Sequence, residues 1–132
     1  ALKRLRDQGA FISVSHPFDP QRSGWPLARL IALAPLVDAI EIANARVLNQ
    51  MMNEHAVQFA QQHNLPGTAG SDAHHPSEIG RVYSIVPEFS DADSLRESIR
   101  QATVAGKVSF PLVHLYSSWA RIVKSSNVTK NT

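Results

Sequence analysis

The chain has 132 residues and no cysteine, so a disulfide framework, a thiolate zinc site and a cysteine nucleophile are all excluded. No apolar run approaches the roughly 20 residues of a membrane-spanning helix, and we expect no membrane partner. The formal net charge of +2 is too small to indicate nucleic-acid binding. The lack of cysteine suits a reducing compartment, so we expect a cytoplasmic protein. An initiator methionine and a signal peptide are also absent, and we expect a piece of a longer or processed protein.

Hydrophobic residues make up 43% of the chain and charged residues 18%, which is ordinary for a packed globular protein. A chain of this length buries roughly two-thirds of its unfolded surface and forms about one domain. We therefore expect a single core over residues 1–124 and a polar, frayed tail over residues 125–132. Because cysteine is absent and histidine occurs six times, any metal site must use histidine and carboxylate ligands.

Short apolar segments alternate with amphipathic segments, which predicts an α/β fold with a mostly parallel sheet. Strands are expected at residues 11–16, 37–42, 68–74, 82–86 and 108–110. Helices are expected to end at Gly9 and to span residues 26–35, 46–63, 90–106 and 115–123. The helix at residues 90–106 begins with a sequence that resembles a capping box. A closed eight-unit barrel takes about 250 residues, so roughly four βα units make either half a barrel or a small open sheet.

Polar side chains with ligand atoms follow three successive strands, at the point where each strand ends. His16 ends the first expected strand, Asn44 follows the second, and Asp72 and His74 end the third. The carboxyl ends of parallel strands meet at one edge of a sheet, and this edge carries the active site in such folds. We therefore expect the four side chains to converge on one site. Asn44 could orient a ligand there or cap the helix that follows.

Asp72 and His74 are two residues apart, so both point to the same side of an extended segment, about 6–7 Å from each other. This spacing suits two metal ions about 3.5–4 Å apart, as in hydrolytic clusters. A solvated turn with a chance aspartate and histidine is the alternative. His75 points the other way, which makes His74 the preferred ligand. The same alternation predicts that Glu41 faces away from Asn44 and has a structural or supporting role.

Four motifs stand in an order that resembles one known family. They are SHPF at residues 15–18, EIAN at residues 41–44, GSDAHH at residues 70–75 and EIG at residues 78–80. Together they resemble the PHP family, named for polymerase and histidinol phosphatase domains. The resemblance implies the C-terminal portion of a distorted (β/α)7 TIM-like barrel, with a multinuclear metal site at the carboxyl ends of its strands. It also implies hydrolysis of phosphoesters with zinc, manganese, iron or magnesium, as two or three ions in the intact domain.

Carried over to this chain, the resemblance makes His16, Asp72 and His74 metal ligands and assigns no catalytic residue beyond them. Four further residues are expected to support these ligands or to lie near the substrate: Asn44, Arg22, Ser71 and His75. A guanidinium can hold phosphate through two hydrogen bonds, although a solvated surface arginine is the alternative for Arg22.

The family's H-x-H motif and its bridging glutamate are absent from this chain. The missing N-terminal part of the domain is therefore an expected partner, and the isolated chain is expected to be inactive. The expected substrate is a phosphorylated small molecule or a nucleotide. Three alternatives stay open: a catalytically silent PHP-like structural or interaction domain, an amidohydrolase-type metal hydrolase, and a small open-sheet binding protein. The last has no glycine-rich phosphate loop to support it.

Overall fold

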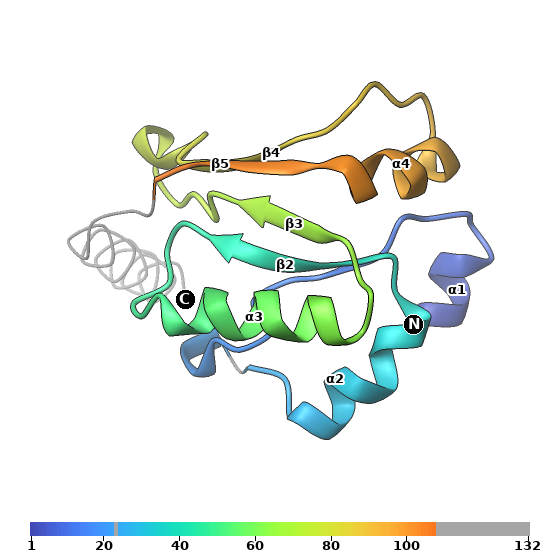
Figure 1. The fold of residues 1–132 in the computed structure, drawn as a ribbon, viewed down its shortest axis with the longest axis horizontal. Coiled ribbons are helices and arrows are strands. Elements are labelled where there is room, and N and C mark those ends of the chain that lie inside the picture. The colour runs from blue at the N-terminus through green and yellow to red at the C-terminus, as the bar shows by residue number, and fades with distance from the viewer. Residues whose placement is uncertain (23, 108–132) are drawn as a thin grey trace, which may run out of the picture.

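The computed structural model describes residues 1–22 and 24–107 of the chain. Within them, three short strands form a parallel sheet in the order β1 (Ser13–Val14), β2 (Ala39–Asn44) and β3 (Gly67–Gly70). The arrowheads of β2 and β3 point the same way in Figure 1, so their carboxyl ends lie together at one edge. A second sheet consists of the antiparallel strands β4 (Val82–Ile85) and β5 (Thr103–Gly106).

Helices cover the parallel sheet and close its core. The α-helices of the described residues are α1 (Leu2–Arg6), α2 (Leu27–Leu33), α3 (Met51–Gln62) and α4 (Ala92–Ser98). Short 3-10 helices are η1 (Pro20–Arg22), η2 (Ala34–Leu36), η3 (Pro76–Glu78) and η4 (Ile99–Gln101). Figure 1 shows α3 alongside β2, with α2 below it. Leu30 of α2, Ile40 of β2 and Phe59 of α3 are buried in one hydrophobic cluster, so these helices share a single core with the sheet.

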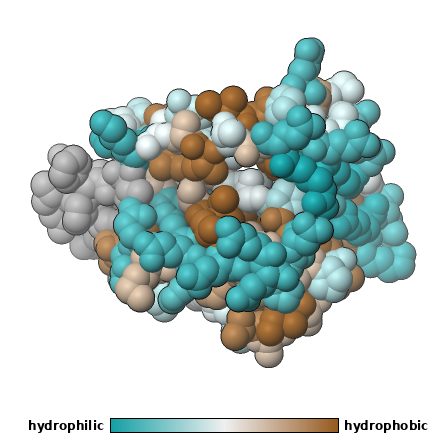
Figure 2. All heavy atoms as spheres, viewed as in Figure 1, coloured by the Kyte–Doolittle hydropathy of each residue, from teal (hydrophilic) through white to brown (hydrophobic). Residues whose placement is uncertain are grey.

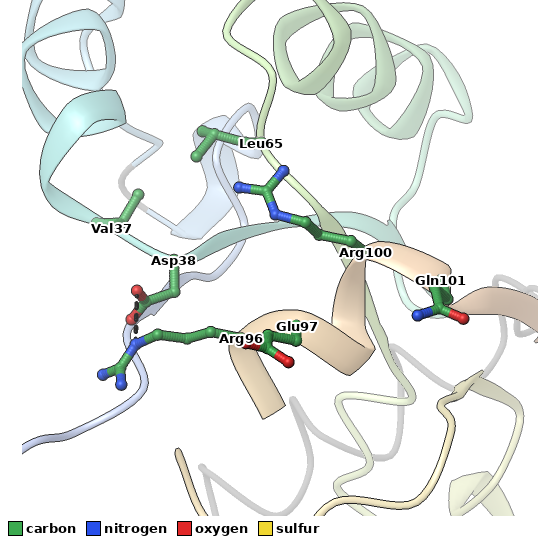
Figure 3. A pocket seen from close by; sticks show the side chains of 7 residues that line it. All are labelled: Val37, Asp38, Leu65, Arg96, Glu97, Arg100 and Gln101. Atoms are coloured by element: carbon green, nitrogen blue, oxygen red, sulfur yellow. Dashed lines mark hydrogen bonds and ion pairs between the residues drawn. The ribbon is translucent and has the colours of Figure 1, made fainter. Parts of the chain in front are cut away.

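Asp38, just before β2, forms hydrogen bonds to α1, to α4 and to the segment that leads into β1. Its carboxylate accepts hydrogen bonds from Arg6 of α1 at 2.8 Å, from Arg96 of α4 at 3.0 Å and from the backbone N–H of Ile12 at 2.7 Å. Figure 3 shows the Asp38–Arg96 pair at the wall of a cavity of about 450 Å³, which is also lined by Leu65. The helices α1 and α4 are therefore held at the end of the sheet opposite to the carboxyl ends of its strands.

The mixed α/β architecture with a parallel sheet agrees with the sequence-based prediction. The TIM-like arrangement is not seen: the described residues form no closed barrel, because β4 pairs with β5 outside the parallel order. The helix expected at residues 90–106 ends early, and its last four residues form β5. Thr103 and Val104 are β-branched and favour a strand, and pairing with β4 satisfies their backbone. The strand and helix expected at residues 108–110 and 115–123, and the tail at 125–132, lie outside the described residues.

Several helix starts differ from the sequence-based prediction. The helix expected from residue 46 begins at Met51, because the preceding residues form a turn after β2. Pro26 precedes α2 as its N-cap, with ψ 133°, and is not its first helical residue. The capping box of α4 pairs Asp91 with Ser94: the Ser94 N–H donates to Asp91 Oδ1 at 2.8 Å, and the Asp91 N–H donates to Ser94 Oγ at 3.0 Å. The box is therefore one residue later than the sequence suggested.

The surface of α2 is partly apolar. Figure 2 shows hydrophobic side chains at the lower edge of the visible face, where α2 lies in Figure 1. The exposed apolar residues of α2 and η2 are Leu27, Ile31 and Leu36. Among the residues that the structure describes, no helix combines the length and the apolar character that a bilayer crossing demands.

Candidate functional site

Three side chains from three successive strands meet at the carboxyl edge of the parallel sheet. His16 lies two residues beyond β1, Asn44 is the last residue of β2, and Asp72 lies two residues beyond β3. The side-chain nitrogen of Asn44 lies 2.9 Å from His16 Nδ1 and donates to Asp72 Oδ2 at 3.4 Å. The structure therefore brings residues that are far apart in the sequence into one polar cluster.

The backbone turns sharply at two of these positions. His16 and Asp72 both adopt a left-handed conformation, with φ of 49° and 50°. Histidine and aspartate are among the residues that occupy this region most often after glycine. The turn follows each strand and redirects the chain, and β1 is limited to Ser13–Val14 within the strand expected at residues 11–16.

The pairing of β2 with β3 contains an irregularity that changes which side chains reach the site. The β3 partners of Glu41 and Ala43 are adjacent residues, so Ile42 is an extra residue in β2. An extra residue reverses the alternation of side chains along a strand. As a result, the Asn44 amide donates to both Glu41 carboxylate oxygens at 3.3 Å. The prediction that Glu41 faces away from Asn44 is wrong for this reason.

Glu41 holds the His16 ring in place. Its Oε2 accepts a hydrogen bond from the His16 backbone N–H at 2.8 Å and lies 2.9 Å from His16 Nδ1. Metal-binding histidines commonly place one ring nitrogen against a carboxylate, which fixes the orientation of the ring. With Nδ1 engaged by Glu41 and Asn44, the other nitrogen of His16, Nε2, points toward Arg22 at 3.4 Å.

Arg22 brings a positive charge between His16 and Asp72. Its guanidinium contacts the Asp72 carboxylate as well as the His16 ring. The buried carboxylate of Asp19 lies 3.5 Å from Arg22 Nε and accepts the Gln21 backbone N–H at 2.9 Å. Asp19 therefore fixes η1 and places Arg22 at the site. Asp19 is not among the predicted site residues, and its only signal in the sequence is its position three residues before Arg22, one helical turn away.

The other expected site residues lie between β3 and β4 and have local partners. His74 Nδ1 lies 2.8 Å from the Asp72 carbonyl oxygen and 3.9 Å from Asp72 Oδ1, and its side chain is 50% exposed. His75 caps η3 through its ring nitrogen. Ser71 Oγ donates to the carbonyl oxygen of the first residue of β4 at 3.1 Å. Asp72 and His74 therefore lie in contact at the site, whereas Ser71 and His75 make local contacts that hold the loop between β3 and β4.

A buried ion pair lies behind this loop. Arg46 and Glu78 contact each other, and Glu78 Oε2 accepts the backbone N–H groups of His74 and His75, each at 2.9 Å. Burial raises the pKa of Glu78, but the His74 N–H and the Arg46 charge lower it by more. The pKa of this carboxyl therefore lies below its usual range, and Glu78 is a buried anion at neutral pH.

Residues 50–104 match a family model described as PHP-associated. This match covers less than half of the chain and agrees with the resemblance to the C-terminal part of a PHP domain. The matched segment includes Asp72 and His74, and it also includes Glu78. His16 and Asn44 precede the matched residues and reach the same site through the parallel sheet.

Two longer proteins are similar to this chain. An uncharacterized protein of Methanocaldococcus jannaschii is 35% identical over 88 residues, which is 63% of this chain and 37% of that protein. The crystal structure of PsfC from Pseudomonas syringae is similar with a TM-score of 0.64 and 26% identity. That likeness covers 93% of this chain and 52% of PsfC. The chain therefore spans only about a third to a half of the length of these relatives.

The donors at the carboxyl edge fit part of a divalent-cation site. Imidazole and carboxylate groups such as those of His16 and Asp72 suit zinc, iron and manganese. A small recess of about 10 Å³ lies beside His16 and Asn44, but Phe18 and Met52 also line it and Asp72 does not. Within residues 1–22 and 24–107, no group of three histidine, aspartate or glutamate side chains is arranged to hold a metal ion. The donor chemistry fits such a cation, and a complete ligand set requires further groups.

Proposed function

We propose that this PHP segment forms part of the active site of a metal-dependent phosphoesterase. The observation that carries the proposal is the convergence of His16, Asn44 and Asp72 at the carboxyl edge, with Glu41 behind the His16 ring. In the intact protein, His16, Asp72 and His74 would hold divalent cations such as zinc, manganese, iron or magnesium, two or three in number. The remaining ligands would come from the N-terminal part of the domain.

The proposed substrate is a phosphorylated small molecule or a nucleotide. Bound cations at such a site supply charge neutralisation for phosphoryl oxygens and activation of a water molecule. Arg22 suits a phosphate-binding role because its guanidinium already faces the cluster and can form two parallel hydrogen bonds to an anion. Glu41 and Asn44 orient the His16 ring, and they keep its Nε2 directed into the site.

The test replaces the proposed ligands in the intact protein that contains this segment. His16→Ala or Asp72→Ala should lower the rate of hydrolysis of a small phosphate ester by about 100-fold or more. Replacing a residue that only supports a metal ligand already lowers metal affinity or activity by about 10- to 100-fold. Asp7→Ala, which removes an exposed carboxylate of the α1 region, is the matched control and should leave the rate unchanged. An unchanged rate in either ligand variant would exclude a ligand role for that residue. If a chelator removes the metal and added manganese or zinc does not restore hydrolysis, the result would count against a metal-dependent reaction.

A second candidate function is a catalytically silent domain with a structural or interaction role. One observation favours it: the part of the chain that the structure describes contains no group of three metal donors. The two proposals differ in the metal content of the intact protein. A purified intact protein that retains less than one equivalent of metal and does not hydrolyse phosphate esters would favour the silent domain.

A further inference from the structure

The buried pair of Arg46 and Glu78 joins two segments that lie 32 residues apart in the sequence. Arg46 follows the carboxyl end of β2, and Glu78 is the last residue of η3. Each side chain is only 2% exposed. Removing two charges from water is costly, and two apolar residues of similar volume are often equally stabilising. Stability alone therefore gives little reason for an ion pair at this place.

Both ends of the pair contact the candidate site. Glu78 Oε2 accepts the backbone N–H groups of His74 and of the next residue at 2.9 Å, while Oε1 contacts Arg46. On the other side, the Arg46 backbone N–H donates to Asn44 Oδ1 at 2.8 Å. Asn44 Nδ2 lies 2.9 Å from His16 Nδ1. A continuous path of polar contacts thus runs from the His16 ring to the backbone of His74.

We propose that Arg46 and Glu78 are positioning residues, which hold the segment Asp72–His74 at a fixed distance from His16. This inference rests on the proposed function, because that segment carries two of the three proposed metal ligands. Neither charge needs to touch a metal or a substrate. Glu78 fixes the backbone that carries the ligands, and Arg46 anchors Glu78 to the end of β2.

The test compares the intact protein that contains this chain with a double variant, Arg46→Met/Glu78→Leu. This variant keeps the approximate volume of the buried pair and removes both charges and the acceptor of the loop amides. Lys3→Met/Asp7→Leu removes an exposed ion pair and is the matched control. Glu78→Gln is a milder second variant, which keeps one oxygen acceptor without the negative charge.

Two quantities are measured by NMR on the ¹⁵N-labelled intact protein. The first is the hydrogen-exchange rate of the His74 and His75 amides without added metal. The second is the Mn²⁺ concentration that broadens the His16 and Asp72 signals to half their height. We expect the double variant to exchange at least about 10-fold faster and to require about 10- to 100-fold more Mn²⁺. The control should stay close to the wild type in both quantities, and Glu78→Gln should shift both in the same direction by less.

A folded double variant with unchanged exchange and an unchanged Mn²⁺ response would overturn the positioning role. If the double variant does not fold, the same comparison with Glu78→Gln decides the question. If the wild-type intact protein shows no site-specific Mn²⁺ broadening, the proposed metal site fails. Amide exchange then still decides whether the pair holds the segment, because faster exchange supports this role and unchanged exchange overturns it.

Discussion

At the scale of single residues, Glu41 has the most direct influence on the site. It accepts the His16 backbone N–H, lies against the His16 ring and receives the Asn44 amide. A short polar residue at this position could not make all three contacts. The fixed ring direction follows from these contacts and does not depend on His16 alone.

Replacing Glu41 should therefore destabilise the fold as well as the site. Glu41→Ala leaves the partly buried His16 N–H without its acceptor, and we expect a loss of about 1–3 kcal/mol in the free energy of unfolding. Urea denaturation measures this loss. Glu54→Ala removes an exposed glutamate of α3 and should change the stability by about 0.5 kcal/mol or less. Equal losses in the two variants would show that the Glu41 contacts contribute nothing to folding.

At the scale of elements, the pairing of β4 with β5 depends on one glycine. Gly106 has a φ of 117°, a region that residues with a side chain rarely adopt. A Cβ added at Gly106 would also overlap the carbonyl oxygen of Arg81. The same carbonyl accepts the backbone N–H of Lys107 at 2.6 Å, so the end of β5 packs closely against the start of β4. This pairing replaces the helix that the sequence pattern favoured.

The variant Gly106→Ala should weaken the second sheet more than conformational strain alone predicts. Gly80 provides the comparison, because its φ of 75° is also positive but no heavy atom lies within 4 Å of an added Cβ. We expect Gly80→Ala to lower the free energy of unfolding by about 1–2 kcal/mol and Gly106→Ala to lower it by clearly more. The free energy of unfolding from urea denaturation measures both. A smaller loss for Gly106→Ala would contradict the close approach to Arg81.

At the scale of the whole molecule, Asp38 connects α1, α4 and the strand segment at Ile12. Figure 3 shows its pair with Arg96 of α4. Burial raises the pKa of Asp38, but hydrogen bonds from Arg6, from the Ile12 N–H and from Arg96 lower it by more. The pKa of this carboxyl in the folded protein therefore lies below its usual value of 3.8. Because the unfolded chain binds the proton more readily, ionised Asp38 stabilises the fold above about pH 4.

This linkage predicts acid sensitivity that depends on Asp38. The contribution of ionised Asp38 to the free energy of unfolding should be fully present above about pH 4. It should be lost as the pH falls through the lowered pKa of Asp38. The free energy of unfolding of the wild type should therefore fall more steeply in this acid range than that of Asp38→Asn. Asp7→Asn, which alters an exposed ion pair, should follow the wild-type slope. Identical slopes for the wild type and Asp38→Asn would contradict the prediction, and urea denaturation as a function of pH measures them.

Much of the architecture could be predicted because it follows from the local spacing of apolar residues along the chain. The apolar spacing of Leu48, Met52, Ala56, Phe59 and Ala60 predicts the inner face of α3. Ala56, Phe59 and Ala60 are buried, whereas Leu48 precedes the helix and is exposed. The positions of His16, Asn44 and Asp72 after apolar segments predict a shared edge, because parallel strands place their carboxyl ends together. These inferences need only the order of residues and the direction of the chain.

Tertiary structure decided what local patterns could not. One extra residue in β2 turned Glu41 toward the site, since strand pairing and not alternation alone fixes the side of each residue. Pairing with β4 made residues 103–106 a strand, because satisfied backbone hydrogen bonds outweigh a weak helical preference. The contact of Arg46 with Glu78 joins residues 32 positions apart, and only the folded chain brings such charges together out of water.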